Sequence, residues 1–121
     1  IQKIHHYIPF IDQKNMKTKA GYLSGGKKHL LALAMVLMQN PSLLILDEPS
    51  AGLSDANVDR LYDTLKAIKQ EEKVTILLIE HRILKMQPFI NRLVMLKNKK
   101  IEEIDKNKTI DQINQLYASK N

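Results

Sequence analysis

The chain has 121 residues and a formal net charge of +6, with 44% hydrophobic and 26% charged residues. This length allows at most one compact domain with a buried core, and the composition is typical of globular proteins. The absence of cysteine excludes a disulfide scaffold, a thiolate zinc site and a cysteine nucleophile. The longest unbroken apolar run, Leu30–Met38, is too short to cross a bilayer, and no leader-like segment indicates secretion.

The first 40 residues predict two helices and a polar connector. Residues 1–11 have apolar side chains at helical spacing, which Pro9 interrupts, and residues 12–19 are polar and basic and predict a loop. Residues 28–39 are apolar on almost every side, which is typical of a buried helix. Asn40 and Pro41 end that helix.

The middle of the chain predicts a strand, a helix and a second strand. Residues 43–46 and 74–79 are short, continuous apolar runs, each followed by polar residues, and they predict strands buried on both faces. Between them Ser54 or Asp55 is expected to cap a helix that carries one apolar stripe, formed by Val58, Leu61, Tyr62, Leu65 and Ile68. This order predicts an α/β fold with a parallel sheet covered on both sides.

The last third predicts a hairpin and a helix. Residues 92–96 and 100–104 flank a turn at Asn98 and Lys99. Thr109 and Gln112 form a capping box for a final helix, whose apolar face carries Ile110, Ile113 and Tyr117. The densest group of lysines lies here, but acids interrupt it and aromatic residues are absent from it: Lys97, Lys99, Lys100, Lys106 and Lys108. We therefore expect a solvated surface and no nucleic-acid partner.

One glycine-containing segment is a candidate phosphate site. Residues 21–28 nearly fit the phosphate-loop pattern G-x-x-x-x-G-K-[ST], but Lys28 replaces the hydroxyl residue and no apolar strand precedes the segment. Residues 23–26, Leu-Ser-Gly-Gly, fit better as the start of the following helix, where Ser24 and the amides of Gly25 and Gly26 could bind an anion. Taken alone, the Ser24-Gly25-Gly26 tripeptide is better explained as a simple helix-start turn.

Acidic residues and a histidine follow the two predicted strands. Chemistry in parallel sheets gathers beyond the carboxyl ends of the strands. Asp47 could hold Mg²⁺, Glu48 could orient or deprotonate an attacking water, and His81 could bind a phosphate or that water. The alternative for Asp47 and Glu48 is a turn that merely ends the strand. We expect the other histidines to be structural or exposed: His5, His6 and His29.

Taken together, these segments resemble the ATP-binding cassette (ABC) ATPases over about residues 20–104. Residues 23–26 resemble the family's signature motif, and residues 43–49 its Walker B strand with the catalytic glutamate. Residues 50–54 resemble the D-loop, and His81 resembles the switch histidine. The resemblance implies a P-loop NTPase-like core that works as a head-to-tail dimer with two ATP molecules between its subunits.

The resemblance also implies a role for each matching residue. Ser24, Gly25 and Gly26 would contact the γ-phosphate of ATP held by the partner subunit, and Asp47 would bind Mg²⁺, through water. Glu48 would act on the water and His81 would sense the γ-phosphate. In the D-loop, Leu53 and Ser54 would lie at the dimer interface.

Departures from the family pattern define which part of a cassette this is. The Walker A loop, the adenine-stacking aromatic residue and the Q-loop glutamine are not found, so we expect residues 1–121 to be the carboxyl-terminal part of one ATPase domain. Residues 1–28 would end the helical subdomain and carry the signature loop, and residues 29–121 would form the core and last helix. Lys27 stands directly after the signature, where Gln or Glu is usual, and Lys28 follows it; Arg82 follows His81 where Asp is common.

The expected function is ATP hydrolysis that powers membrane transport, by a subunit at the cytoplasmic face of the membrane. ATP and Mg²⁺, a second ATPase subunit and transmembrane domains are the implied ligands and partners. The Gly52-Leu53-Ser54 ending of the D-loop looks like that of branched-chain amino-acid importers. Two alternatives stay open: a soluble ABC-type ATPase acting on ribosomes or DNA, and a catalytically incomplete fragment. The isolated chain is expected to be inactive.

Overall fold

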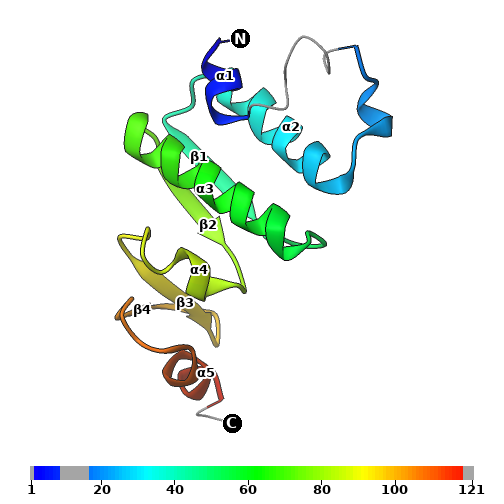
Figure 1. Ribbon diagram of the computed structural model, residues 1–121. Helices are drawn as coiled ribbons and strands as arrows, with labels where there is room; N and C mark the ends of the chain where they lie inside the picture. Colours follow the sequence, from blue (N-terminus) through cyan, green and yellow to red (C-terminus); the bar gives the residue numbers. More distant parts are fainter. Residues whose placement is uncertain (1, 9–16, 119–121) are drawn as a thin grey trace. The chain divides into compact units, whose positions relative to one another are not determined.

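The computed structural model describes residues 2–8 and 17–118, which divide into two compact units, residues 1–81 and 82–121. The elements of the first unit are α1 (Gln2–Tyr7), the 3-10 helix η1 (Ala20–Tyr22), α2 (Gly25–Leu37), β1 (Leu43–Asp47), α3 (Asp55–Glu71) and β2 (Thr75–Ile79). Those of the second are α4 (Ile83–Met86), β3 (Leu93–Lys97), β4 (Lys100–Ile104) and α5 (Ile110–Ala118) (Figure 1).

The first unit is built on a parallel β–α–β arrangement, as the sequence predicts. Strands β1 and β2 pair in parallel from Leu43 opposite Thr75 to Asp47 opposite Ile79, and α3 connects them and runs along them (Figure 1). The predicted stripe of α3 is confirmed, since all of its members are at most 2% exposed: Val58, Leu61, Tyr62, Leu65 and Ile68. These side chains form most of the core of the unit together with buried residues of α1, α2 and β1.

The prediction that both strands are buried on two faces is wrong for the described residues. Alternate residues of the sheet point to opposite faces. On one face Leu44 is buried, and Leu46, Ile76 and Leu78 are half-buried. The other face is apolar but 48–58% exposed, and it is formed by Leu43, Ile45, Leu77 and Ile79. Helix α3 therefore accounts for the cover on one face, and no described element of this unit covers the other.

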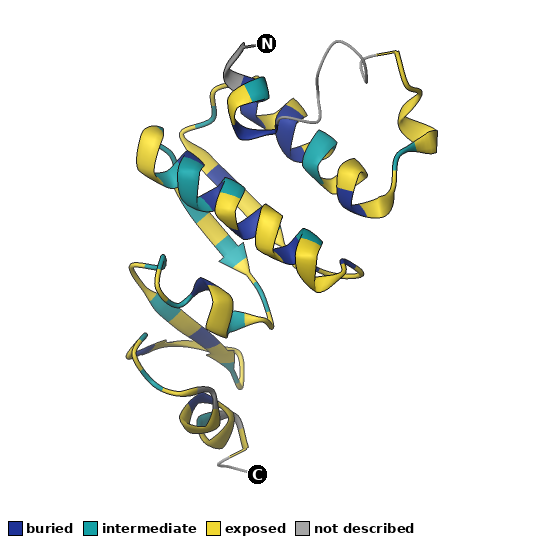
Figure 2. Cartoon of the chain, in the orientation of Figure 1, coloured by how far each residue is buried: buried dark blue, intermediate teal, exposed yellow. Residues whose placement is uncertain are grey.

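Helix α2 departs from its prediction in the same way. Its buried residues are Gly26, Leu33, Ala34 and Leu37, which lie on one side, whereas Met35 is 61% and Val36 40% exposed (Figure 2). The helix begins at Gly25, earlier than the predicted residue 28, and the chain leaves it at Asn40, whose φ is 48°. An all-round apolar helix therefore has only part of its surface covered here.

Helix α1 packs against α3 through a buried tyrosine. The single proton of the Tyr7 hydroxyl is shared between Glu72 Oε1 at 2.9 Å and Glu71 Oε2 at 3.2 Å. Burial raises the pKa of Tyr7, and both carboxylates raise it further.

The predicted loop at residues 12–19 and the apolar residues 9–11 lie outside the described residues, except for the turn at 17–19.

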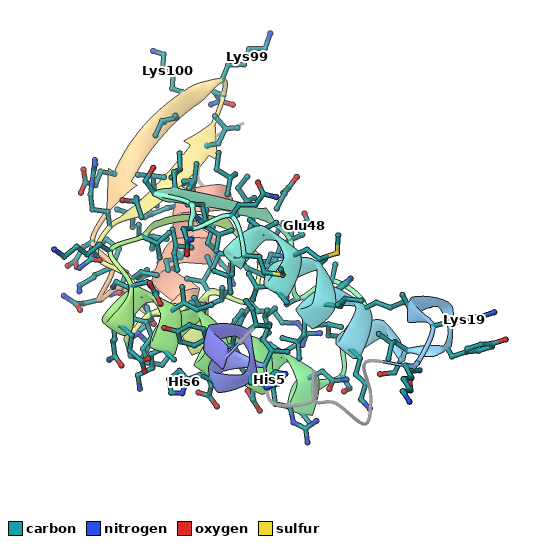
Figure 3. All side chains as sticks on the ribbon, turned by 90° about the horizontal axis from the view of Figure 1, so that it is seen from above. His5, His6, Lys19, Glu48, Lys99 and Lys100 are labelled. Atoms are coloured by element: carbon teal, nitrogen blue, oxygen red, sulfur yellow. The ribbon has the colours of Figure 1, made fainter. Side chains whose placement is uncertain are left out.

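The second unit contains the predicted hairpin and helix. Strands β3 and β4 are antiparallel, and the turn residues Asn98 and Lys99 both have positive φ, 50° and 63°, as in a type I′ turn. Figure 3 shows Lys99 projecting from the tip of this hairpin. The capping box is confirmed, because Gln112 N–H donates to Thr109 Oγ1 at 3.3 Å and Thr109 N–H donates to Gln112 Oε1 at 2.9 Å. No helix of the described chain is long and apolar enough to span a membrane.

Candidate functional site

Three predicted site residues lie at the carboxyl ends of the two parallel strands. Asp47 is the last residue of β1, Glu48 follows it, and His81 lies two residues beyond the end of β2. The Glu48 N–H donates to Ile79 O at 2.9 Å, so the ladder between the strands continues past Asp47. The parallel pairing therefore brings together residues that are more than 30 positions apart in the sequence.

Glu48 and His81 are in direct contact. Glu48 Oε1 lies 2.9 Å from His81 Nε2, and the side chains are 49% and 84% exposed. Glu48 has a φ of 45°, an uncommon backbone conformation for a residue with a side chain, so its placement depends on the surrounding hydrogen bonds. Figure 3 labels Glu48 among the side chains of this unit. The pair presents one acidic and one imidazole group to solvent at the same edge of the sheet.

A hydrogen-bonded turn follows Glu48. Ala51 N–H donates to Glu48 O at 3.0 Å, and Leu53 N–H donates to Ser50 O at 3.1 Å. Ser50 is 3% exposed, and its N–H donates to Glu80 Oε1 at 2.9 Å. Sequence reasoning assigned no role to Glu80, although an acid directly before His81 at the end of a strand was a visible signal.

The predicted interface residues of this turn differ in exposure. Leu53 is 8% exposed, so its side chain packs within this chain, whereas Ala51, Gly52 and Ser54 are exposed. Ser54 occupies the position before α3, and its carbonyl accepts from the Asn57 and Val58 amides at 2.9 Å. The Ser54 hydroxyl makes no capping hydrogen bond. The exposed part of the turn is the part free to meet another molecule.

The Ser24–Gly26 segment lies on a different element, the start of α2. Ser24 is the residue before the helix, and its hydroxyl makes no capping hydrogen bond. The first amides of a helix have no carbonyl partner within it and carry partial positive charge, which suits an anion. Residues 17–24 contain a turn and η1 rather than a strand, which agrees with the rejection of a phosphate loop at this place.

The two glycines of this segment have different surroundings. A Cβ added at Gly25 would have no atom within 4 Å, whereas one at Gly26 would lie 2.8 Å from Asn57 Cγ and Nδ2. Gly26 therefore permits close packing of α2 on the start of α3, and Gly25 is open on the outside. The sequence could not separate these two roles, because both glycines fit the same motif.

A histidine also connects α2 with the turn after β1. His29 Nδ1 lies 3.2 Å from Pro49 O. We expected His29 to be structural or exposed, and it is exposed while making this one contact. His6 is likewise exposed and pairs with Glu71 Oε2 at 2.8 Å.

The residues present suit Mg²⁺ only together with a phosphate ligand. No group of three acidic, histidine or cysteine side chains able to hold a metal occurs in the part of the chain that the structure describes. Asp47 supplies one exposed carboxylate at the end of β1. Mg²⁺ is commonly bound by one or two carboxylates, with waters and substrate phosphates completing its six ligands. Asp47 therefore fits an ion that arrives with a nucleotide.

Comparisons with known proteins agree with the fold and with part of the sequence. Residues 1–51 match the ABC transporter family. The energy-coupling factor transporter ATP-binding protein EcfA2 of Clostridioides difficile is 33% identical over 93 residues, 76% of this chain and 32% of that protein. The probable branched-chain amino acid transport ATP-binding protein LivF of Archaeoglobus fulgidus is 41% identical over 68 residues, 56% of this chain and 29% of that protein.

Solved structures extend the likeness over nearly the whole chain. The ADP conformation of MJ1267, an ATP-binding cassette of an ABC transporter, superimposes with a TM-score of 0.75 and 27% identity. That likeness covers 97% of this chain and 44% of MJ1267. The chain spans about a third or less of the curated relatives named above. The chain therefore has the fold of part of an ATP-binding cassette, and its sequence is similar to those of ABC transporter ATP-binding proteins.

Proposed function

We propose that this chain is part of an ATPase subunit that powers membrane transport, and that Glu48 and His81 act at its site of ATP hydrolysis. The observation that carries the proposal is the 2.9 Å contact between Glu48 Oε1 and His81 Nε2 at the ends of adjacent parallel strands. The ATP-binding proteins among the relatives support the nucleotide as substrate.

Glu48 would act as the general base for the attacking water. Its carboxylate is half exposed, so water can reach it, and its backbone is fixed to β2 through Ile79 O. A positioned carboxylate can take the proton of a water as the water attacks phosphorus. His81 would hold that carboxylate on one side and reach the γ-phosphate or the water on the other.

Asp47 would hold Mg²⁺ beside this pair. When bound, Mg²⁺ neutralises charge on the phosphate oxygens. Asp47 lies on the exposed face of the sheet, directly before Glu48, so its carboxylate and that of Glu48 serve different positions around one phosphate.

Ser24, Gly25 and Gly26 would complete the ATP site of a second subunit in a head-to-tail dimer. The exposed Ser24 hydroxyl and the first amides of α2 form a donor set suited to a γ-phosphate. Leu53 and Ser54 would connect the two sites across the interface. Ser54 is exposed and would contact the other subunit, whereas Leu53 is buried and would hold the turn to its own subunit. Transmembrane subunits would complete the transporter at the cytoplasmic face of a membrane.

We also propose a branched-chain amino-acid importer as the type of transporter. The Gly52-Leu53-Ser54 ending and the LivF relative support this type. EcfA2 has a comparable likeness, so the family supports transport in general more strongly than this substrate.

The experiment substitutes Glu48 by Gln in a complete subunit that contains these residues. We expect ATP binding to be retained and steady-state hydrolysis to be lost, because the amide cannot accept the proton of water. Glu102→Gln, an exposed carboxylate on β4, is the matched control and should hydrolyse at the wild-type rate. Near wild-type turnover by the Glu48 variant would refute its role as the base. The 121-residue chain alone should hydrolyse no ATP above background, because its sequence holds no phosphate loop.

A further inference from the structure

The Glu80 carboxylate connects the two chain segments that carry Glu48 and His81. Its Oε1 accepts a hydrogen bond from Ser50 N–H at 2.9 Å, and its Oε2 accepts one from His81 N–H at 2.9 Å. Ser50 belongs to the turn after β1, and His81 follows β2. Each oxygen of one side chain is therefore bonded to a different segment.

Backbone donors after β1 show why this connection matters. Pro49 has no N–H, so the first two donors after Asp47 are those of Glu48 and Ser50. Glu48 N–H donates to Ile79 O, and Ser50 N–H donates to Glu80 Oε1. The acceptors of both amides therefore belong to consecutive residues at the end of β2, Ile79 and Glu80. A buried backbone amide needs a partner, and the Ser50 amide has a charged one.

These hydrogen bonds form a closed ring together with the contact between Glu48 and His81. The ring runs from Glu48 along the chain to Ser50, across to Glu80, on to His81 and back to Glu48 through the 2.9 Å side-chain contact. Glu48 has a φ of 45°, a conformation that persists only when neighbouring groups hold it. The two bonds to the Glu80 carboxylate hold Ser50, which lies two residues after that strained position, and His81, whose side chain contacts Glu48.

We propose that Glu80 is a positioning residue that keeps the Glu48 carboxylate within hydrogen-bonding reach of His81. It does so through the Ser50 and His81 amides and without touching the substrate. The functional consequence rests on the proposed role of Glu48 and His81 in hydrolysis, whereas the connection itself is a property of the folded chain.

The connection is tested by NMR on the ¹⁵N-labelled full chain. As the pH is lowered through the carboxylate range, the amide protons of Ser50 and His81 should move upfield together with one shared midpoint. In Glu80→Gln both amides should lose most of this dependence, because only the weaker effect of the Glu48 carboxylate remains, and in the control Glu102→Gln they should keep all of it. Separate midpoints, or an undiminished dependence in Glu80→Gln, would overturn the proposal. The wild-type titration needs no variant, so it decides even if a substitution prevents folding.

The positioning role is tested by kinetics of a complete subunit that contains these residues. We expect Glu80→Ala to lower kcat by about tenfold to a hundredfold with little change in KM for ATP, and Glu80→Gln, which keeps one acceptor, to lower it less. Wild-type kcat in Glu80→Ala, with Glu48→Gln inactive, would overturn the positioning role alone. Wild-type hydrolysis by Glu48→Gln would instead overturn the proposed function and leave the NMR result standing.

Discussion

The unequal surroundings of Gly25 and Gly26 predict opposite effects of the same substitution. An added Cβ at Gly25 meets open space, so Gly25→Ala should stabilise the chain by about 0.4–1 kcal/mol through reduced freedom of the unfolded state. At Gly26 the Cβ would lie 2.8 Å from Asn57 Cγ, against about 3.5–4 Å for an ordinary carbon contact. Relieving such an overlap costs about 1–3 kcal/mol, so Gly26→Ala should be the less stable of the two variants.

The assay is equilibrium unfolding of the full chain by urea, for both variants and for each combined with Asn57→Ala. Removing the Asn57 amide should abolish most of the penalty at Gly26 and change nothing at Gly25, which gives a coupling of about 1–3 kcal/mol for the first pair only. Equal stabilities of Gly25→Ala and Gly26→Ala, in both backgrounds, would refute the reasoning. Gly25→Ala is then the variant of choice for testing the phosphate site, because its fold is expected to be intact.

Three further effects follow from burial, charge and backbone conformation. Leu65→Ala, in the core at 1% exposure, should lower the free energy of unfolding by about 2–5 kcal/mol, and Leu96→Ala, at 66% exposure, by less than about 0.5 kcal/mol in the same urea assay. The raised pKa of Tyr7 means that its contribution to stability is complete below pH about 10 and is lost as the pH rises towards the folded-state value. Tyr7→Phe should therefore show a shallower loss of stability above pH about 10, and parallel curves would contradict this. Lys99→Gly should stabilise the hairpin by about 1 kcal/mol, because Lys99 has a φ of 63°, which glycine adopts more easily. The measurement is the unfolding free energy followed by NMR signals of residues 82–121, and an unchanged or lower stability would contradict this.

Local patterns were sufficient to predict most of the fold. Three predictions are confirmed: the apolar stripe of α3, the parallel or antiparallel pairing of the strands, and the Thr109–Gln112 capping box. Each was predicted from side chains that are close together in the sequence. The prediction of burial on both faces of β1 and β2 was wrong. An apolar sequence shows what a segment could bury, whereas actual burial depends on which other elements are present.

The site was predicted only in part, for a related reason. Position after a strand placed Glu48 and His81 at one edge of the sheet, because parallel strands end together. The contacts of Glu80 with Ser50 and of His29 with Pro49 depend on side-chain directions in three dimensions. No spacing rule in the sequence encodes such contacts.

The most direct test of the central claim asks whether Ser24 serves the ATP site of the other subunit. Two complete subunits that contain these residues, one with Ser24→Arg and one with Glu48→Gln, should each be inactive alone. Mixed in equal amounts, they should regain about a quarter of the wild-type ATPase rate, because half of the dimers are mixed and each mixed dimer holds one intact site. No recovery above either variant alone would contradict the assignment of Ser24 and Glu48 to opposite sides of a shared ATP site.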